Sequence, residues 1–197
     1  RYEGIIDIRW NEAKALVVDN NGNVYITGCS NGDYATIKYN SNGQEIWVAR
    51  YNGPGNNVDA ATAIAVDNDG NVYVTGASVE RGTSFDYATV KYNPQGQEVW
   101  VARYNGPEDS IDVAMAIAID DNDNIYVTGY SWNSNAGYDY VTIKYSVVSI
   151  EEKEKKQISK KTLKTISANL PKTENLKIHN ILGKIVNPKN LKPGIYF

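Results

Sequence analysis

The sequence predicts an all-β protein: a partial β-propeller of about three four-stranded antiparallel blades, followed by a small β-sandwich-like C-terminal module. The first observation is internal repetition, because segments 19–28, 67–76 and 120–129 each carry an Asp/Asn-rich turn followed by Tyr-x-Thr-Gly. Their spacings of 48 and 53 residues are typical of a propeller or a solenoid. The second observation is the lack of a sustained 3.6-residue periodicity in residues 1–146, which excludes a helical repeat.

The most complete repeat spans residues 61–107 and divides into four segments that are typical of strands. Val, Ile, Tyr, Thr and Trp dominate these segments, as they do in β-sheets. The connections contain Gly or Pro where the chain must reverse. The predicted strands are Ala63–Asp67, Asn71–Gly76, Asp86–Asn93 and Gln97–Tyr104. Four antiparallel strands in about 50 residues form one blade of a propeller.

The same pattern divides the rest of the chain. Three blades are predicted at residues 13–51, 61–104 and 114–146, a charged linker at 147–161, and a separate, truncated module at 162–197. A short helix is the alternative for the linker. Residues 1–12 read as the end of a blade whose beginning is missing, so we expect the sequence to be a fragment of a longer chain. Because about three blades cannot close a ring, we also expect open ends with exposed apolar faces and self-association.

The repeat has a specific resemblance. Residues 63–76 read Ala-Ile-Ala-Val-Asp-Asn-Asp-Gly-Asn-Val-Tyr-Val-Thr-Gly, residues 86–92 read Asp-Tyr-Ala-Thr-Val-Lys-Tyr, and Gly-Gln-Glu-Val-Trp follows at 96–100. This pattern resembles the bacterial SBBP-type β-propeller repeat, which is related in pattern to NHL-repeat propellers. The resemblance covers residues 1–146 in three tandem copies. It implies the fold but no particular activity, because propellers carry many unrelated functions.

The tail has a second resemblance. Leu176–Val186 and Asn190–Phe197 resemble the C-terminal sorting domain of the type IX secretion family, with His179 in place of the more usual Tyr. This resemblance implies a sorting signal that binds the secretion machinery, and hence a secreted or cell-surface protein. A small sandwich that only caps the propeller edge is the alternative. The residues that carry the signal pattern are Ile178, Asn180, Leu182, Gly183, Pro193, Gly194 and Tyr196.

Charge and composition exclude several classes of function. Residues 1–146 carry a formal charge of −10 and residues 147–197 one of +7, so the acidic repeat region is unsuited to nucleic acid. No apolar stretch is long enough for a transmembrane segment. The single cysteine, Cys29, forms no internal disulfide. The single histidine, His179, lies in the tail, so residues 1–146 contain neither a histidine-based catalytic triad nor a histidine metal site.

The Asp-rich turns suggest calcium, because alternating oxygen ligands suit that ion. An EF-hand loop counted from Asp67 would need Gly at position six and Glu at position twelve, but Gly70 stands at position four and Ser78 at position twelve. A hairpin turn between the first two strands of each blade explains all three copies. We therefore predict structural turns and no cofactor, with calcium as the alternative.

Other recurring residues are also predicted to be structural. Asp33, Asp86 and Asp139 each precede a Tyr, and we expect them to form a hydrogen bond that fixes the entry to the third strand. Trp47 and Trp100 recur at the fourth strand and indicate packing between blades.

One segment does not recur. Trp132 lies in a Ser/Asn-rich loop between Tyr130 and Tyr138, and such an aromatic loop is a candidate site for a carbohydrate or a protein ligand, with ordinary loop packing as the alternative. The predicted function is a non-enzymatic secreted or cell-surface scaffold or binding module. The alternative is a fragment of a propeller enzyme, a hydrolase or a lyase, whose catalytic residues lie in other blades.

Overall fold

The computed structural model describes residues 11–82, 84–135 and 137–147, together with Leu176–His179 and Ile185–Val186. Every regular element in these ranges is a β-strand. Among the same residues, none belongs to a helix that is long and apolar enough to span a membrane. The prediction of an all-β fold with four-stranded antiparallel blades is therefore confirmed.

The strands form three antiparallel sheets in chain order. The first sheet contains β1 (Asn11–Val18), β2 (Val24–Ser30), β3 (Asp33–Tyr39) and β4 (Glu45–Tyr51). The second sheet contains β5 (Asp59–Val66), β6 (Val72–Val79), β7 (Phe85–Tyr92) and β8 (Glu98–Tyr104). The third sheet contains β9 (Asp112–Ile119), β10 (Ile125–Asn133), β11 (Gly137–Val147), β12 (Leu176–His179) and β13 (Ile185–Val186).

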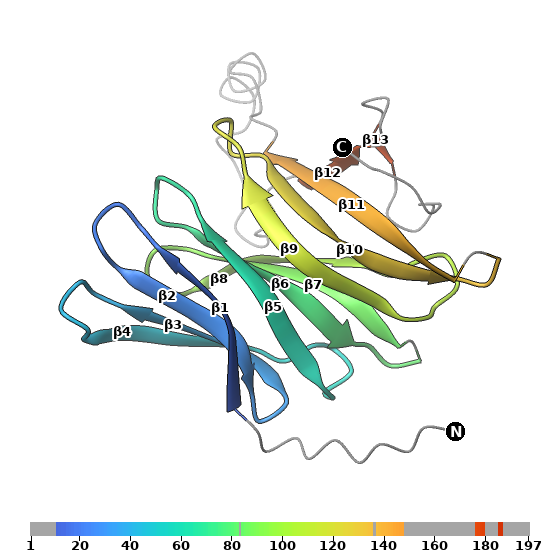
Figure 1. Ribbon diagram of the computed structural model, residues 1–197, viewed down its shortest axis with the longest axis horizontal. Coiled ribbons are helices and arrows are strands. Elements are labelled where there is room, and N and C mark those ends of the chain that lie inside the picture. The colour runs from blue at the N-terminus through green and yellow to red at the C-terminus, as the bar shows by residue number, and fades with distance from the viewer. Residues whose placement is uncertain (1–10, 83, 136, 148–175, 180–184, 187–197) are drawn as a thin grey trace, which may run out of the picture.

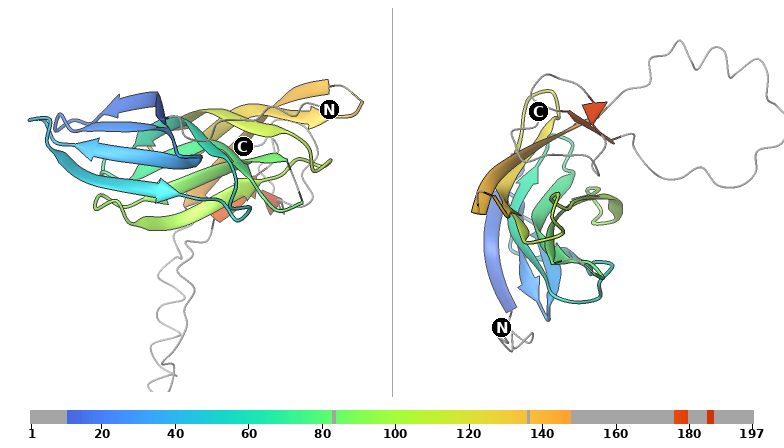
Figure 2. Two further views of the ribbon diagram at one scale, coloured as in Figure 1. Left: turned by 90° about the horizontal axis from the view of Figure 1, so that it is seen from below. Right: turned by 90° about the vertical axis from the view of Figure 1, so that its right-hand side faces the viewer.

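The sheets stack as successive twisted layers (Figure 1). Strand β5 contacts β1, β2 and β3, and β9 likewise contacts β5, β6 and β7, so each sheet packs on the face of the one before it (Figure 2). Two apolar cores fill the spaces between the layers. Tyr25, Val74 and Tyr92 belong to the first core, and Val127 and Tyr145 belong to the second. This is the face-to-face packing of neighbouring propeller blades.

Each sheet contains a β-bulge in its first strand, opposite a glycine in the second strand. In the second sheet the pairing shifts between Ala61 and Ala63, and Ala61 lies opposite Gly76. A Cβ atom at Gly76 would lie 2.1 Å from the carbonyl oxygen of Ala60, so only glycine fits here. The bulge extends β5 back to Asp59, four residues before the predicted start of the strand at Ala63.

Polar and aromatic contacts tie each layer to the next. The hydroxyl of Tyr34 donates to the carbonyl oxygen of Ala88 at 3.2 Å, and that of Tyr87 donates to Val141 at the same distance. The rings of Trp47 in β4 and Tyr92 in β7 lie 6.3 Å apart. A second pair, Trp100 and Tyr145, repeats this contact at 6.0 Å. The prediction that both tryptophans pack between blades is therefore confirmed.

The third sheet obtains its fourth strand from the tail. Strand β12 pairs antiparallel with β11, with Ile178 opposite Tyr145, at the place that β4 and β8 occupy in the other sheets. The sequence pattern does not predict this pairing. The residues from Asn180 to Gly183 and from Pro193 to Tyr196 that carry the sorting pattern lie outside the described residues, as does most of the predicted C-terminal module. Of the linker predicted at 147–161, Val147 belongs to β11 and the other residues also lie outside the described residues.

Replacing Gly76 by Ala is expected to lower the free energy of unfolding by more than about 3 kcal/mol, because the new methyl group has no room against the Ala60 carbonyl. Gly43 is the matched control, since its Cβ would meet nothing within 4 Å and only its φ of 77° is strained. Gly43→Ala should lower the free energy of unfolding by about 1 kcal/mol. Urea unfolding monitored by tryptophan fluorescence measures both losses, and equal losses would contradict the prediction.

Candidate ligand-binding site

The Asp-rich turns are hairpin connections that the aspartate itself closes. Asp67 Oδ1 accepts the backbone N–H of Asp69 at 3.0 Å and that of Asn71 at 2.8 Å. Its Oδ2 accepts the Asn71 side-chain amide at 2.8 Å and the Tyr73 hydroxyl at 3.0 Å. The turns at Asp19 and Asp120 repeat this arrangement. The hairpin interpretation is confirmed, and both oxygens of the carboxylate are engaged within the turn.

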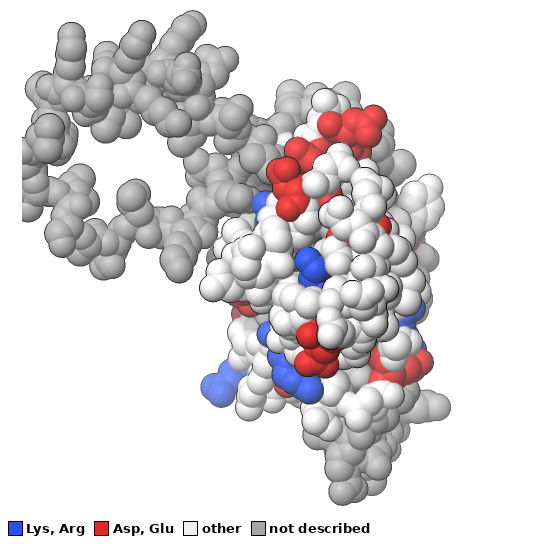
Figure 3. Space-filling model, turned by 90° about the vertical axis from the view of Figure 1, so that its left-hand side faces the viewer, with Lys and Arg blue, Asp and Glu red and all other residues white. Residues whose placement is uncertain are grey.

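A cleft of about 390 Å³ lies between the first two of these turns, with Asp19 and Asp67 among its lining residues. On its wall, the Lys38 ammonium lies 5.0 Å from the centre of the Tyr25 ring, which is a cation–π contact. Figure 3 shows Asp and Glu side chains as separate patches, with uncharged surface and Lys or Arg side chains between them. Within the described residues, no group of three or more His, Cys, Asp or Glu side chains converges as a metal site would require. The two turn carboxylates of the cleft thus serve first as parts of their own hairpins.

Buried carboxylates lie at the junctions between the sheets. Asp59 accepts the backbone N–H of Gly53 at 2.6 Å, and Asp112 accepts that of Gly106 at 2.5 Å. Burial raises the pKa of the Asp59 carboxyl, against the opposing effect of its hydrogen bond with Ser78. Burial also raises the pKa of the Asp112 carboxyl. Both aspartates thus hold the connection that leads from one sheet into the next.

Arg103 completes the junction between the first and second sheets. Its guanidinium donates to Ser78 Oγ at 2.6 Å, to the Tyr51 hydroxyl at 3.0 Å and to Asp86 Oδ2 at 3.1 Å. The predicted hydrogen bond at the entry to the third strand is therefore confirmed for Asp86. Sequence reasoning missed Arg103, although its recurrence as Arg50 was a usable signal.

The structure brings the three predicted aromatic residues together on the β10–β11 hairpin. Trp132 lies opposite Tyr138 in the pairing, and their rings meet edge to face at 5.0 Å and 73°. Tyr130 and Tyr138 meet edge to face at 5.1 Å and 81°. Trp132 is 36% exposed and Tyr138 is 54% exposed. We call Trp132 and Tyr138 the aromatic tip. Sequence reasoning missed Tyr140, which lies opposite Tyr130 and is 71% exposed.

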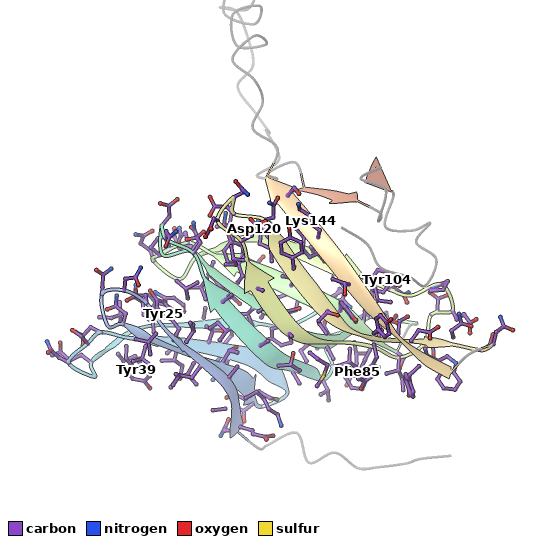
Figure 4. The ribbon with its side chains drawn as sticks, turned by 45° about the horizontal axis from the view of Figure 1, so that its top comes forward. Tyr25, Tyr39, Phe85, Tyr104, Asp120 and Lys144 are labelled. Atoms are coloured by element: carbon purple, nitrogen blue, oxygen red, sulfur yellow. The ribbon has the colours of Figure 1, made fainter. Side chains whose placement is uncertain are left out.

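Hydrogen bonds hold the loop beside the aromatic tip in one shape. Glu108 accepts the backbone N–H of Ser134 at 2.8 Å and its hydroxyl at 2.7 Å. Asn133 Oδ1 accepts the N–H of Asn135 at 2.9 Å. A preordered aromatic surface with neighbouring amide and hydroxyl groups binds a ligand with little loss of side-chain entropy. Phe85 is the counterpart of Tyr138 in the second sheet, and Figure 4 shows it at the opposite end of the stacked sheets from Asp120.

The repeats in these sheets match a known family of β-propeller repeats. The SBBP family model, described as a beta-propeller repeat, matches residues 12–35, 46–78 and 99–135. At these three places the chain matches SBBP beta-propeller repeats. The three matches fall in the first, second and third sheets and in the connections between them. No curated protein matches the chain.

The turn at Asp120 should have a distinctive acid titration. The hydrogen bonds from Asn124, together with those from Tyr126 and Asn122, lower the pKa of the Asp120 carboxyl to about 2. Because this pKa is below its unfolded value, the stabilisation is complete above the unfolded pKa and is lost as the pH falls toward 2. We expect ¹³C NMR of the carboxyl group to show this low midpoint, and Asn124→Ala to raise it. A midpoint at the ordinary value in the unaltered chain would contradict the assignment.

Proposed function

We propose that this SBBP repeat protein is a non-enzymatic scaffold that binds a carbohydrate or a protein through the aromatic tip. The observation that carries the proposal is the exposure of Trp132 and Tyr138 on a hairpin whose loop is already ordered by Glu108. An exposed Trp–Tyr pair offers a large apolar contact area with few rotatable bonds. The Asn and Ser groups beside it supply the hydrogen bonds that orient a ligand.

The distribution of polar chemistry supports a binding role over an enzymatic one. The buried carboxylates with raised pKa, Asp59 and Asp112, recur in two sheets and each accepts a backbone N–H at a sheet junction. Perturbed pKa values also arise in structural networks, and this repetition identifies such a network. The aromatic tip, in contrast, occurs in the third repeat alone: Val79 and Phe85 stand at the equivalent positions of the second.

We further propose that the protein is secreted or displayed at the cell surface, and that the tail binds the secretion machinery. The support is the sequence pattern that runs from Ile178 to Tyr196 and its position after a sharp change of composition. The acidic repeat region and the basic tail differ in formal charge, −10 against +7, which is consistent with two separate tasks.

The aromatic tip is tested by truncation. Trp132→Ala and Tyr138→Ala should each weaken binding about tenfold or more, because each removes a buried anchor of the complex. Arrays of oligosaccharides and of surface proteins identify the ligand, and titration calorimetry then measures the loss. Tyr39→Ala, at the other end of the molecule, is the control. Unchanged affinity in both tip variants would refute the proposed site.

The sorting role is tested without removing β12. Pro193→Ala combined with Gly194→Glu, in the native host, should leave the thermal melt of the purified protein unchanged but retain the protein inside the cell envelope. The matched control is Lys189→Ala, which lies in the same segment but outside the pattern. Normal amounts of the double variant at the surface or in the medium would refute the sorting role.

A further inference from the structure

The two described interfaces between sheets contain the same contact, in which a tyrosine of one sheet donates to a backbone carbonyl of the next. A sheet in the stack therefore presents a different face to each of its two neighbours. The donor face carries the tyrosine whose hydroxyl reaches the next sheet, and the acceptor face carries the carbonyl that receives it. In the second sheet Tyr87 belongs to the donor face and Ala88 O to the acceptor face. The buried tyrosine hydroxyl enters a space left by a glycine: Cβ atoms at Gly76 and Gly129 would lie 2.9 Å from Tyr34 Oη and 2.8 Å from Tyr87 Oη.

The donor face of the third sheet is uncovered. Tyr140 occupies the place of Tyr87, but it is 71% exposed, whereas Tyr87 is 0% exposed. The Thr128–Thr142 hydroxyl contact at 2.9 Å keeps the form of the Thr75–Thr89 contact, so the face is built for stacking. In the described part of the chain no sheet packs on it.

Among the described residues, no strand packs on the acceptor face of the first sheet either. Leu16 is 60% exposed and Val48 is 45% exposed, whereas Ile64, the counterpart of Leu16, is 9% exposed. A hollow of about 380 Å³ lies on this face, lined by Gly28 and Ala35 among others. Gly28 is the counterpart of Gly76, and Ala35 that of Ala88, so this hollow has the form of a tyrosine slot, and no tyrosine of the described residues lines it.

We propose that the acceptor face of one molecule binds the donor face of a second copy of this chain. Tyr140 of one copy enters the hollow of the other and donates its hydroxyl to the carbonyl oxygen of Ala35, while the apolar side chains Leu16 and Val48 become buried. The contact continues the stacking already present twice within the chain. The proposed interface is heterologous, because two different faces meet in it. Each added copy leaves one face free, so further copies can join head to tail.

This assembly leaves the aromatic tip only partly accessible. Val79 and Phe85, the counterparts of Trp132 and Tyr138, remain half-buried although a third sheet covers the second. The tip therefore lies at the rim of the head-to-tail contact, on the same face of the hairpin as Tyr140, and assembly would cover part of it.

The test uses the full chain and two variants that block one face each. Tyr140→Glu places a charge on the donor face, and Val48→Glu places one on the acceptor face. Both residues are exposed, so thermal melts should match that of the unaltered chain. In sedimentation velocity, the sedimentation coefficient of the unaltered chain should rise with protein concentration. The sedimentation coefficient of each variant alone should not rise.

The decisive measurement is the mixture. Tyr140→Glu retains an acceptor face and Val48→Glu retains a donor face, so an equimolar mixture should form a heterodimer and stop there. Tyr140→Phe removes only the hydroxyl and should weaken association about threefold to tenfold. Ser41→Glu, in an exposed turn, is the charge control and should associate normally.

Three results would overturn the proposal. One is an unaltered chain that stays monomeric at every concentration. Nitration of Tyr140 then shows whether its ring is exposed or is covered by another segment of the same chain, and either result overturns the proposal. Another is self-association of either charged variant at the affinity of the unaltered chain. The third is a mixture that remains monomeric although both variants are folded. None of these results bears on ligand binding at the aromatic tip.

Discussion

The hydrogen bond from a tyrosine hydroxyl in one sheet to a backbone carbonyl in the next is the contact on which the stack depends. Tyr34 and Tyr87 are both fully buried, and a buried hydroxyl without an acceptor would be strongly unfavourable. The carbonyl lies within reach only because glycine replaces a side chain at Gly76 and Gly129. That glycine lies opposite the bulge in the first strand, so the bulge, the glycine and the interlayer hydrogen bond form one unit.

Position in the stack, rather than residue type, sets the environment of each repeated group. Arg50 and Arg103 are equivalent in sequence, but Arg50 is exposed and binds only Ser30 among the contacts described here. Arg103 also binds Tyr51 of the first sheet and Asp86 of its own sheet, since a preceding sheet covers it. A cluster of this kind resembles an active site locally, yet its partners are accounted for by the junction that it stabilises.

Sequence reasoning succeeded where a residue and its near neighbours in sequence determine the local structure. It failed where packing against a neighbouring sheet, or pairing with a distant strand, determines the structure. The turn at Asp67 was predictable because the residues that satisfy its carboxylate lie within six positions. The start of β5 at Asp59 was missed, because an Ala-rich stretch with a bulge lacks the alternation of a regular strand. The exposure of Tyr140 was invisible, since the same tyrosine occurs in all three repeats. The pairing of β12 was missed because residues 148–175 separate it from its partner strand.

The third repeat differs from the second at the tip and agrees with it along the stacking face. Tyr140 and the Thr128–Thr142 pair keep the identities that the second sheet uses for packing. In contrast, Trp132 and Tyr138 replace Val79 and Phe85, and both replacements enlarge the aromatic surface or add a polar group. Packing positions are restricted because a change of even one methylene is felt in a filled interface. Positions at the rim escape this restriction, so a repeat can acquire a ligand surface there without losing its place in the stack.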